Sequence, residues 1–441
     1  MTGPVRTPVQ ADFAAQGLSQ TNSMVPERPS RIRWVLTNPV FYLLAPVVAS
    51  AIVWIVPGTS DELRGFTTRA DGTIEGWVLV CVFYLVTAAL VWLGFRIGRM
   101  LGPSDRLVAA TDSRAFDRRF SNVLTVLASV GVLYSVYLVQ QQTSIFDVLG
   151  ESQGNQLKEA IGGVAGVATL RYTAAIAAPV ALYVWRFRGG RLAPAIWNLL
   201  LLVTSSLFSS RLSFIMAVVV LVFIVVHLVP SFKVRPVPLA LMGSAVFAGL
   251  VAFNYFRNAR FYEALGVTDP VSMNFYQVAA YLGSPFQVSL GVADGIAHRG
   301  FSVASEPVGA LALLVPSFLR PDGAQFGSNG SFAAFVQVAP NLSTNSAFGD
   351  TFADYGWWGL IYVVLTLGLA GYLAGFVSKF RSLVVVAGAV VCYALAEVWR
   401  LFLFPSGIIV YLLLSVLGAT IIGLSAKDRR PNGTTRVDFR R

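Results

Sequence analysis

Charge is what this sequence has least of. Lysine, arginine, aspartate and glutamate together make up 12% of its 441 residues, against about 25% in soluble domains. Hydrophobic residues make up 55%, and a water-soluble surface cannot be built from that balance. We therefore expect a protein that lies in a membrane.

Other absences narrow the class further. The two cysteines, Cys81 and Cys392, are far apart in apolar segments, which argues against a disulfide framework or a zinc site. A nucleotide-phosphate loop of the form GxxxxGK[ST] is missing, so ATP-driven work is not expected. The ten-residue alternation of a membrane barrel is missing too. These absences favour an all-α polytopic transmembrane helical bundle that uses no cofactor and no metal.

Long apolar runs are what the sequence does have. Runs of about 18 to 20 apolar residues can cross a hydrocarbon core of about 30 Å as helices. We expect about ten spans, with a range of 10–12, and the candidates are 39–56, 76–95, 121–139, 172–185, 194–208, 212–229, 238–256, 356–376, 383–401 and 407–425.

The net charge of +11 predicts an orientation rather than a nucleic-acid partner, because the basic residues adjoin the apolar spans. Most of them fall on one side when both termini are placed in the cytoplasm, as the positive-inside rule requires. We expect a multi-pass protein of the cell inner (plasma) membrane. Its parts would be a flexible tail (1–35), one transmembrane domain (36–426) with a large extracytoplasmic loop (257–355), and a basic tail (427–441).

Arg211 is the first candidate functional residue. The fifth predicted span provides only about 22 Å of helix and is followed by the turn SSRLS, which would recess Arg211 below the outer membrane surface. A guanidinium there calls for an anionic partner, and its rigid fork suits the phosphates of a lipid carrier. The alternative interpretation is an interfacial arginine that snorkels to lipid phosphates.

A second group of candidates follows in the outer loop. Arg257 and Arg260 are three residues apart in NYFRNARFYE and would share a helix face, as an anion-binding pair or as part of an aromatic belt. Asp350 and Asp354 are four apart in NSAFGDTFADYGWWG. They could bind sugar hydroxyls or act as a general base, or they could simply complement a helix start.

The ninth predicted span contains Glu397 and Arg400, three residues apart. We expect them to pair with each other, or Arg400 to face the same cavity as Arg211. Of the two histidines, only His298 in the outer loop is a candidate acid or base, and a solvated loop histidine is the simpler interpretation.

Two of these segments carry a family resemblance. The short span ending in SSRLSFIMAVVVLV, the long loop, and NSAFGDTFADYGWWGLIYVVLTLGLAGYLAG together resemble the O-antigen polymerase type of membrane oligosaccharide repeat-unit polymerase. In the resemblance Arg211 matches the arginine after the short span. The signature before the later span is matched by Gly349, Asp350, Gly356 and Gly359. The loop arginines would correspond to Arg257 and Arg260, although neither is followed eleven positions later by the glycine found in some members.

The resemblance implies a metal-independent glycosyltransferase outside the cytoplasm. A growing glycan on a polyprenyl-diphosphate carrier would move onto the next lipid-linked repeat unit, for a cell-surface polysaccharide, or onto another acceptor in the ligase variant. The expected partners are these lipid-linked donor and acceptor glycans, membrane lipids and a flippase or chain-length regulator. The expected catalytic residues are Arg211 and Asp350, and the expected substrate-binding residues are Arg257, Arg260, Arg400, Asp354, Asn345 and His298.

Two other functions stay open from the sequence. A glycosyltransferase that uses polyprenyl-monophosphate sugars would place acids in the first outer loop, where Asp61 and Glu62 stand, although adjacent acids also suit a solvated turn. A lipid-linked oligosaccharide flippase or other transporter would line a path through the middle of the membrane with polar residues, and few charges lie there.

Overall fold

In the computed structural model of the protein, the described residues are 31–55, 72–142, 167–209, 211–229, 266–303, 306–315 and 346–425, with 244, 248–249, 251 and 263–264. Every regular element within these residues is a helix and none is a strand. The predicted all-α class is therefore confirmed for this part of the chain.

The elements follow the apolar runs of the sequence. The α-helices in chain order are α2 (Arg31–Thr37), α3 (Pro39–Ile55), α4 (Ile74–Met100), α5 (Asp105–Thr111), α6 (Arg114–Gln142), α9 (Ala174–Arg188), α10 (Leu192–Ser209), α11 (Arg211–Leu228), α13 (Pro270–His298), α14 (Pro307–Ala310), α16 (Ala347–Val377), α17 (Val386–Ala396) and α18 (Gly407–Ser425). Short 3₁₀ helices are η2 (Val167–Thr173), η3 (Leu311–Leu314) and η5 (Leu383–Val385).

Four of the described helices, α4, α6, α16 and α18, are long and apolar enough to cross a membrane. Four shorter apolar helices, at 39–55, 192–207, 213–228 and 383–396, coincide with further predicted spans. The seventh predicted span, 238–256, lies almost wholly outside the described residues. The membrane class is thus supported, and the total of about ten spans stays a prediction.

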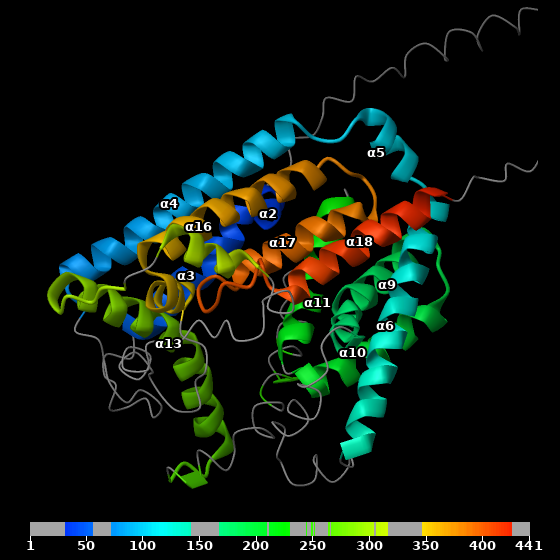
Figure 1. Ribbon diagram of the computed structural model, residues 1–441. Helices are drawn as coiled ribbons and strands as arrows, with labels where there is room; N and C mark the ends of the chain where they lie inside the picture. The colour runs from blue at the N-terminus through cyan, green and yellow to red at the C-terminus, as the bar shows by residue number, and fades with distance from the viewer. Residues whose placement is uncertain are drawn as a thin grey trace, which may run out of the picture.

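The most extensive helix pair is α4 with α16, which run side by side along the upper edge of the bundle (Figure 1). Gly94 of α4 faces Gly368 of α16, and Gly98 faces Tyr372, so residue numbers rise together and the helices are parallel. Both helices therefore begin at the same end of the bundle.

Glycines allow this pair to approach at backbone distance. A Cβ atom on Gly94 would lie 2.1 Å from the carbonyl oxygen of Gly368, and one on Gly371 would lie 2.3 Å from that of Val91. Small residues four apart are typical of membrane helix interfaces, where van der Waals packing replaces the hydrophobic effect. Any side chain at these positions would separate the two backbones.

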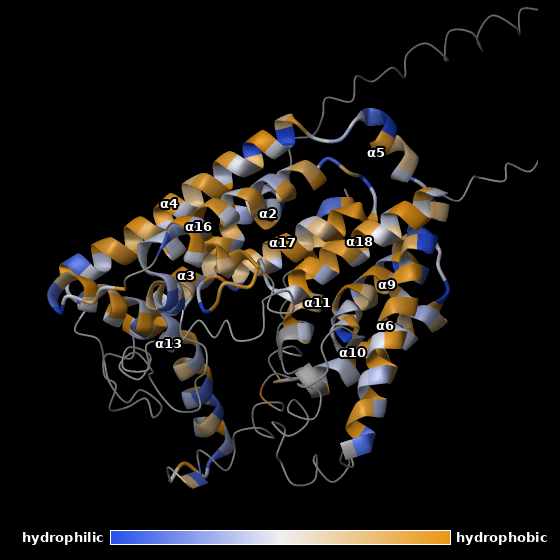
Figure 2. Ribbon diagram, in the orientation of Figure 1, coloured by the Kyte–Doolittle hydropathy of each residue, from blue (hydrophilic) through white to orange (hydrophobic). Residues whose placement is uncertain are grey.

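Arginines gather at one end of the bundle, which we call the arginine-rich end; blue segments mark it around α5 in Figure 2. It comprises the C-terminal ends of α4, α9 and α16 and the N-terminal ends of α6 and α10. Its basic residues are Arg96, Arg99, Arg106, Arg114, Arg118, Arg119, Arg186, Arg188, Arg191, Lys379 and Arg381.

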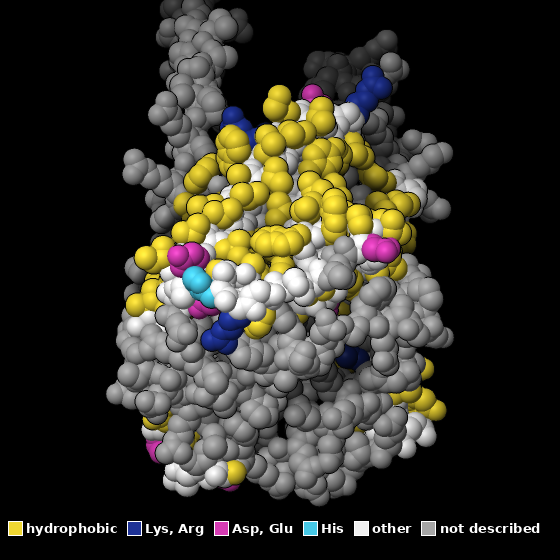
Figure 3. Space-filling model, turned by 60° about the vertical axis from the view of Figure 1, so that its left-hand side comes forward, with side chains coloured by type: hydrophobic (Ala, Val, Ile, Leu, Met, Phe, Trp, Pro, Cys, Tyr) yellow, Lys and Arg dark blue, Asp and Glu magenta, His cyan; other side chains and the backbone are white. Residues whose placement is uncertain are grey.

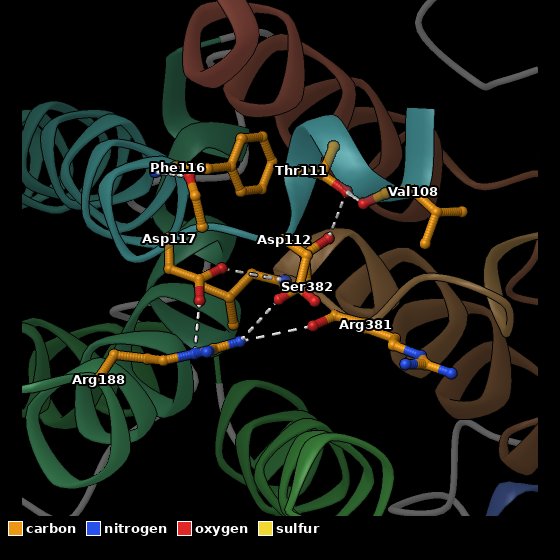
Figure 4. Close-up of polar contacts among 10 residues, drawn as sticks. Val108, Thr111, Asp112, Phe116, Asp117, Arg188, Arg381 and Ser382 are labelled. Carbon is orange, nitrogen blue, oxygen red and sulfur yellow. Dashed lines mark hydrogen bonds and ion pairs between the residues drawn. The ribbon is translucent and has the colours of Figure 1, made fainter. Parts of the chain in front are cut away.

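A polar cluster ties four chain segments together at the arginine-rich end (Figure 4). The fully buried Asp117 of α6 lies 2.8 Å from Nε of Arg188 on α9. It also accepts a hydrogen bond from the backbone N–H of Leu383 at 3.4 Å. A second carboxylate, Asp112, lies 3.6 Å from the Arg188 guanidinium. The cluster neutralises Arg188 and orients α6 and α9 against η5, which leads into α17.

The opposite end, which we call the α13 end, carries most of the described acidic residues. Asp294 of α13 accepts hydrogen bonds from the backbone N–H groups of Gly72 and Thr73 at 3.1 and 3.2 Å, which anchors the start of α4. Figure 3 shows a broad hydrophobic area with charged side chains above and below it: Lys and Arg with an acidic side chain among them above, and acidic, histidine and Lys or Arg side chains along its lower border. Such a belt is typical of a surface that faces lipid.

The glycine interface gives the first testable prediction. Replacing Gly371 by Leu should lower the stability of the detergent-purified protein by about 1–3 kcal/mol or more, because overpacking must push α4 and α16 apart. Gly418→Leu on α18 is the matched control, since no atom lies within 4 Å of its Cβ position. Denaturation in increasing sodium dodecyl sulfate measures both, and equal midpoints for the two variants would contradict the packing account.

Candidate functional site

Asp350 and Asp354 lie in the first turns of α16, at the α13 end. Ser346 caps this helix, because its Oγ accepts the backbone N–H of Gly349 at 2.8 Å. A Cβ atom on Gly349 would lie 2.9 Å from Val288 of α13, so the helix start packs closely on α13. The helix begins upstream of the predicted span, and four residues of spacing place the two carboxylates on one face.

Gly356 interrupts α16 directly after these carboxylates. Its φ of 57° and ψ of −148° are not helical, and residues other than glycine rarely adopt these backbone angles. The break separates a short N-terminal segment that carries Asp350 and Asp354 from the long apolar segment that packs on α4. The carboxylates are therefore held at the edge of the membrane helix rather than inside it.

Glu397 and Arg400 form the predicted ion pair, joined by Arg400 Nε and Glu397 Oε2. Both are buried, at 4% and 8% exposure. The predicted ninth span, 383–401, is too long: α17 ends at Ala396, and the pair lies in the turn beyond it. Here the Arg400 N–H bonds to the Glu397 carbonyl at 2.9 Å, an i→i+3 bond that tightens the chain out of the α-helix.

An aromatic ring lies over the Arg400 guanidinium. Its Cζ lies 5.3 Å from the ring centroid of Tyr281 on α13, within cation–π range. The Tyr281 ring packs edge-on against Trp399 at 5.9 Å. Arg400 therefore connects the end of α17 to the middle of α13.

Buried polar side chains follow one face of α13. Asn274, Gln277 and Ser284 are 7%, 4% and 1% exposed, and with Tyr281 their spacing of three and four residues places them in one stripe. Within the described part of the chain, Asn274 Oδ1, Gln277 Oε1 and Ser284 Oγ have no hydrogen-bond partner. A buried polar atom left unpaired costs about 1–3 kcal/mol, so the stripe is suited to a polar ligand rich in hydroxyl groups.

Arg171 is a further buried cation at the same end. Its η2 segment packs on α6 at Gly131, where a Cβ atom would lie 2.3 Å from the Arg171 backbone nitrogen. Gly131 lies roughly 25 Å along α6 from its arginine-rich start. Arg171 is 7% exposed and its guanidinium lies over the Tyr172 ring at 4.9 Å. One of its terminal nitrogens donates a hydrogen bond to the Tyr172 hydroxyl at 3.3 Å, while its Nε has no partner among the described residues.

Arg171 also lies near the α10–α11 junction, where Arg211 was predicted to be recessed. Ser205, in the last turns of α10, donates a hydrogen bond to the Arg171 carbonyl oxygen at 3.2 Å. Helix α10 runs from Leu192 to Ser209, so with 18 residues it is longer than the predicted span 194–208, and the predicted shortness of this span is wrong. Helix α11 begins at Arg211, so the two helices are joined by a short connection, as predicted. The position of the Arg211 side chain lies outside what the structure describes.

The remaining predicted residues divide into two groups. Arg257, Arg260 and Asn345 lie outside the described residues. His298 is the last residue of α13 rather than part of a loop, and its Nε2 lies 3.3 Å from Glu75 at the start of α4. His298 is half-exposed, and its contact with Glu75 connects the end of α13 to the start of α4.

The structure brings some predicted residues together and not others. Arg400 and the Asp350 segment both contact α13, while Arg171 and Arg211 share the α10 end. The stripe on α13 and Arg171 were missed from the sequence. The i, i+3, i+7 spacing of Asn274, Gln277 and Tyr281 was a visible signal for the first, whereas nothing local distinguishes Arg171. No group of three potential metal ligands occurs within the described residues.

Comparisons with protein families, with characterised proteins and with solved structures give no significant match.

The buried ion pair gives a second prediction. Glu397→Gln should destabilise the purified protein by about 3–5 kcal/mol, because it leaves the Arg400 charge buried without its counter-ion. Glu306→Gln is the matched control, since Glu306 is exposed and makes no side-chain cap at α14. Thermal unfolding in detergent compares the two, and a Glu397→Gln protein as stable as the control would contradict a buried, paired Arg400.

Proposed function

We propose that this protein is a membrane glycosyltransferase that polymerises, or ligates, polyprenyl-diphosphate-linked oligosaccharide repeat units on the extracytoplasmic face. The observation that carries the proposal is the burial of Arg171, whose Nε has no partner among the described residues. Arg171 lies near the junction of α10 and α11, and Arg211 is the first residue of α11. A buried cation without a counter-ion is costly. The diphosphate of a lipid carrier would supply the missing charge.

The orientation of the bundle supports this assignment. Positive residues face the cytoplasm in multi-pass membrane proteins, so the arginine-rich end would lie inside and the α13 end outside. The parallel α4 and α16 fit this scheme, because both would run from the outer to the inner surface, as the order of predicted spans requires. The buried arginines and the α13 stripe would then meet substrate on the outer face of a plasma membrane.

The chemistry follows from the charges. The bond between the anomeric carbon of the donor glycan and its diphosphate oxygen breaks, and the electron pair leaves on the diphosphate. Arg171 and Arg211 would stabilise that developing negative charge. An acceptor sugar hydroxyl forms the new bond and gives up its proton, for which Asp350 is the proposed base.

The α13 stripe suits the glycan part of the substrate. Sugar hydroxyls donate and accept hydrogen bonds, and Asn274 Oδ1 and Gln277 Oε1 offer buried acceptors without described partners. Tyr281 and Trp399 add aromatic surface next to Arg400. We propose that this face of α13 orients the acceptor or the growing chain.

Substitution of Arg171 tests the proposed function. Arg171→Ala should reduce glycan transfer by about 10²-fold or more, the loss typical of removing one charge-stabilising donor, and shorten the polymer on the carrier lipid. Arg171→Lys keeps the positive charge but not the planar guanidinium that can bind two phosphate oxygens at once, and it should retain part of the activity. Chain length is measured by gel electrophoresis of the lipid-linked glycan in cells with matched protein levels.

Arg299→Ala is the control for that experiment, because Arg299 is an exposed arginine at the same end of the bundle. It should leave chain length unchanged. Wild-type chain length in the Arg171→Ala protein would sink the proposal. Transfer from a polyprenyl-monophosphate sugar but not from the diphosphate would assign the protein to the other glycosyltransferase class.

Gly131 offers an independent route to the same arginine. Gly131→Leu leaves every charged group in place but should displace η2 from α6, since even a Cβ atom would lie 2.3 Å from the Arg171 nitrogen. Polymer length should therefore fall as it does in Arg171→Ala, whereas Gly418→Leu should have no effect. An active Gly131→Leu protein of normal abundance would show that the position of Arg171 is unimportant.

A further inference from the structure

A second polar site lies at the arginine-rich end, opposite the proposed transferase site and next to the Asp117–Arg188 ion pair. A cavity of about 440 Å³ opens between α6, α9 and α10. Its polar lining comes from Arg118, Ser121 and Asn122 of α6 and from Arg191, with Pro194 of α10 at one side. It is therefore a cavity with two guanidiniums in its wall.

Both guanidiniums are left without a carboxylate. Among the described residues, no acidic side chain lies at ion-pair distance from Arg118 or Arg191, because the nearby Asp112 and Asp117 are bound to Arg188. Arg118 instead donates a hydrogen bond to the carbonyl oxygen of Gly189 at 2.9 Å. That contact holds its guanidinium at the cavity and leaves its charge uncompensated.

Two helix ends meet at the cavity. Helix α9 ends at Gly189 in the left-handed region, with φ of 69°, and its N–H and that of Gly190 both donate to the Val184 carbonyl. Helix α10 begins at Leu192, and its N-terminal end, where the helix dipole is positive, adjoins the cavity through Arg191 and Pro194.

An apolar surface continues from the cavity along α6. Val126, Val130 and Leu133 are 61%, 49% and 53% exposed, and their spacing of four and three residues places them on the same helix face as Arg118 and Asn122. Trp197 of α10 donates a hydrogen bond to the Ser129 hydroxyl of α6 at 2.8 Å, and an exposed tryptophan there is typical of a membrane interface. A polar cavity at the head of an exposed apolar stripe matches the two parts of a membrane lipid.

We propose that this cavity binds the phosphate of an anionic phospholipid, with the acyl chains along the exposed face of α6. Arg118 and Arg191 would bind the phosphate oxygens through charge-assisted hydrogen bonds, and Asn122 would contact the rest of the headgroup. A soluble phosphate would use the guanidiniums but gain nothing from the apolar stripe. The site is distinct from the proposed transferase site and does not depend on it.

The test compares lipids on the purified protein. Phosphatidylglycerol should raise the thermal unfolding temperature more than phosphatidylcholine with the same acyl chains. In the double variant Arg118→Gln/Arg191→Gln its apparent affinity should fall about tenfold or more, the equivalent of about 1.4 kcal/mol. Inorganic phosphate at millimolar concentration should reproduce little of the effect.

The control keeps the number of removed charges constant. Arg106→Gln/Arg114→Gln removes two exposed arginines from the same end but outside the cavity, and it should bind phosphatidylglycerol as the wild type does. Asn122→Trp keeps both arginines and fills the cavity, and it should bind weakly. Equal phosphatidylglycerol binding by the wild type and the cavity variants would overturn the proposal, as would an inorganic phosphate effect as large as that of the lipid.

Discussion

The backbone contact between α4 and α16 determines at which end of the bundle α16 begins, next to α13 and the start of α4. Because Gly94, Gly98, Gly371 and Gly375 carry no Cβ, the two helices touch along their length and run parallel. The start of α16 therefore lies at the same end as the start of α4, which Asp294 of α13 holds in place. The start of α16 with Asp350, and the position of α13 against α4, thus depend on one glycine-lined contact.

Three arginines that are not exposed differ in their partners. At the arginine-rich end Arg188 is neutralised by Asp117 and Asp112. Arg400 has one carboxylate and the Tyr281 ring, while Arg171 is equally buried and its Nε has no partner among the described residues. Since an intramembrane charge needs a partner, this imbalance is the physical basis for assigning an anionic lipid-linked substrate to the α13 end.

Much of the fold could be predicted from apolar length alone. The last predicted span, 407–425, coincides with α18, and most other boundaries lie within a few residues of the helices. Two predicted boundaries differ from the helices for local reasons. Helix α16 extends upstream of Gly356 because Ser346 caps it, and α17 ends before the predicted residue 401 because the Glu397–Arg400 pair lies in a tight turn. Hydropathy does not detect caps or ion pairs.

The proposed site was less accessible from the sequence. Asp350, Asp354 and Arg400 could be selected because they are polar residues beside apolar spans. Arg171 could not, because its backbone packs on Gly131 of α6, forty residues earlier in the chain, and nothing near Arg171 in the sequence indicates that contact. The stripe on α13 has a readable spacing, but only the structure shows that its oxygens are buried without described partners.

The central claim is that a buried cationic site at the α13 end recognises the diphosphate of a lipid carrier. Its most direct measurement is native mass spectrometry of the purified protein with equal amounts of polyprenyl diphosphate and polyprenyl monophosphate. The account predicts that the wild-type protein retains the diphosphate preferentially and that this preference is lost in Arg171→Ala. Equal retention of both lipids by the wild type, or an unchanged preference in the variant, would contradict it.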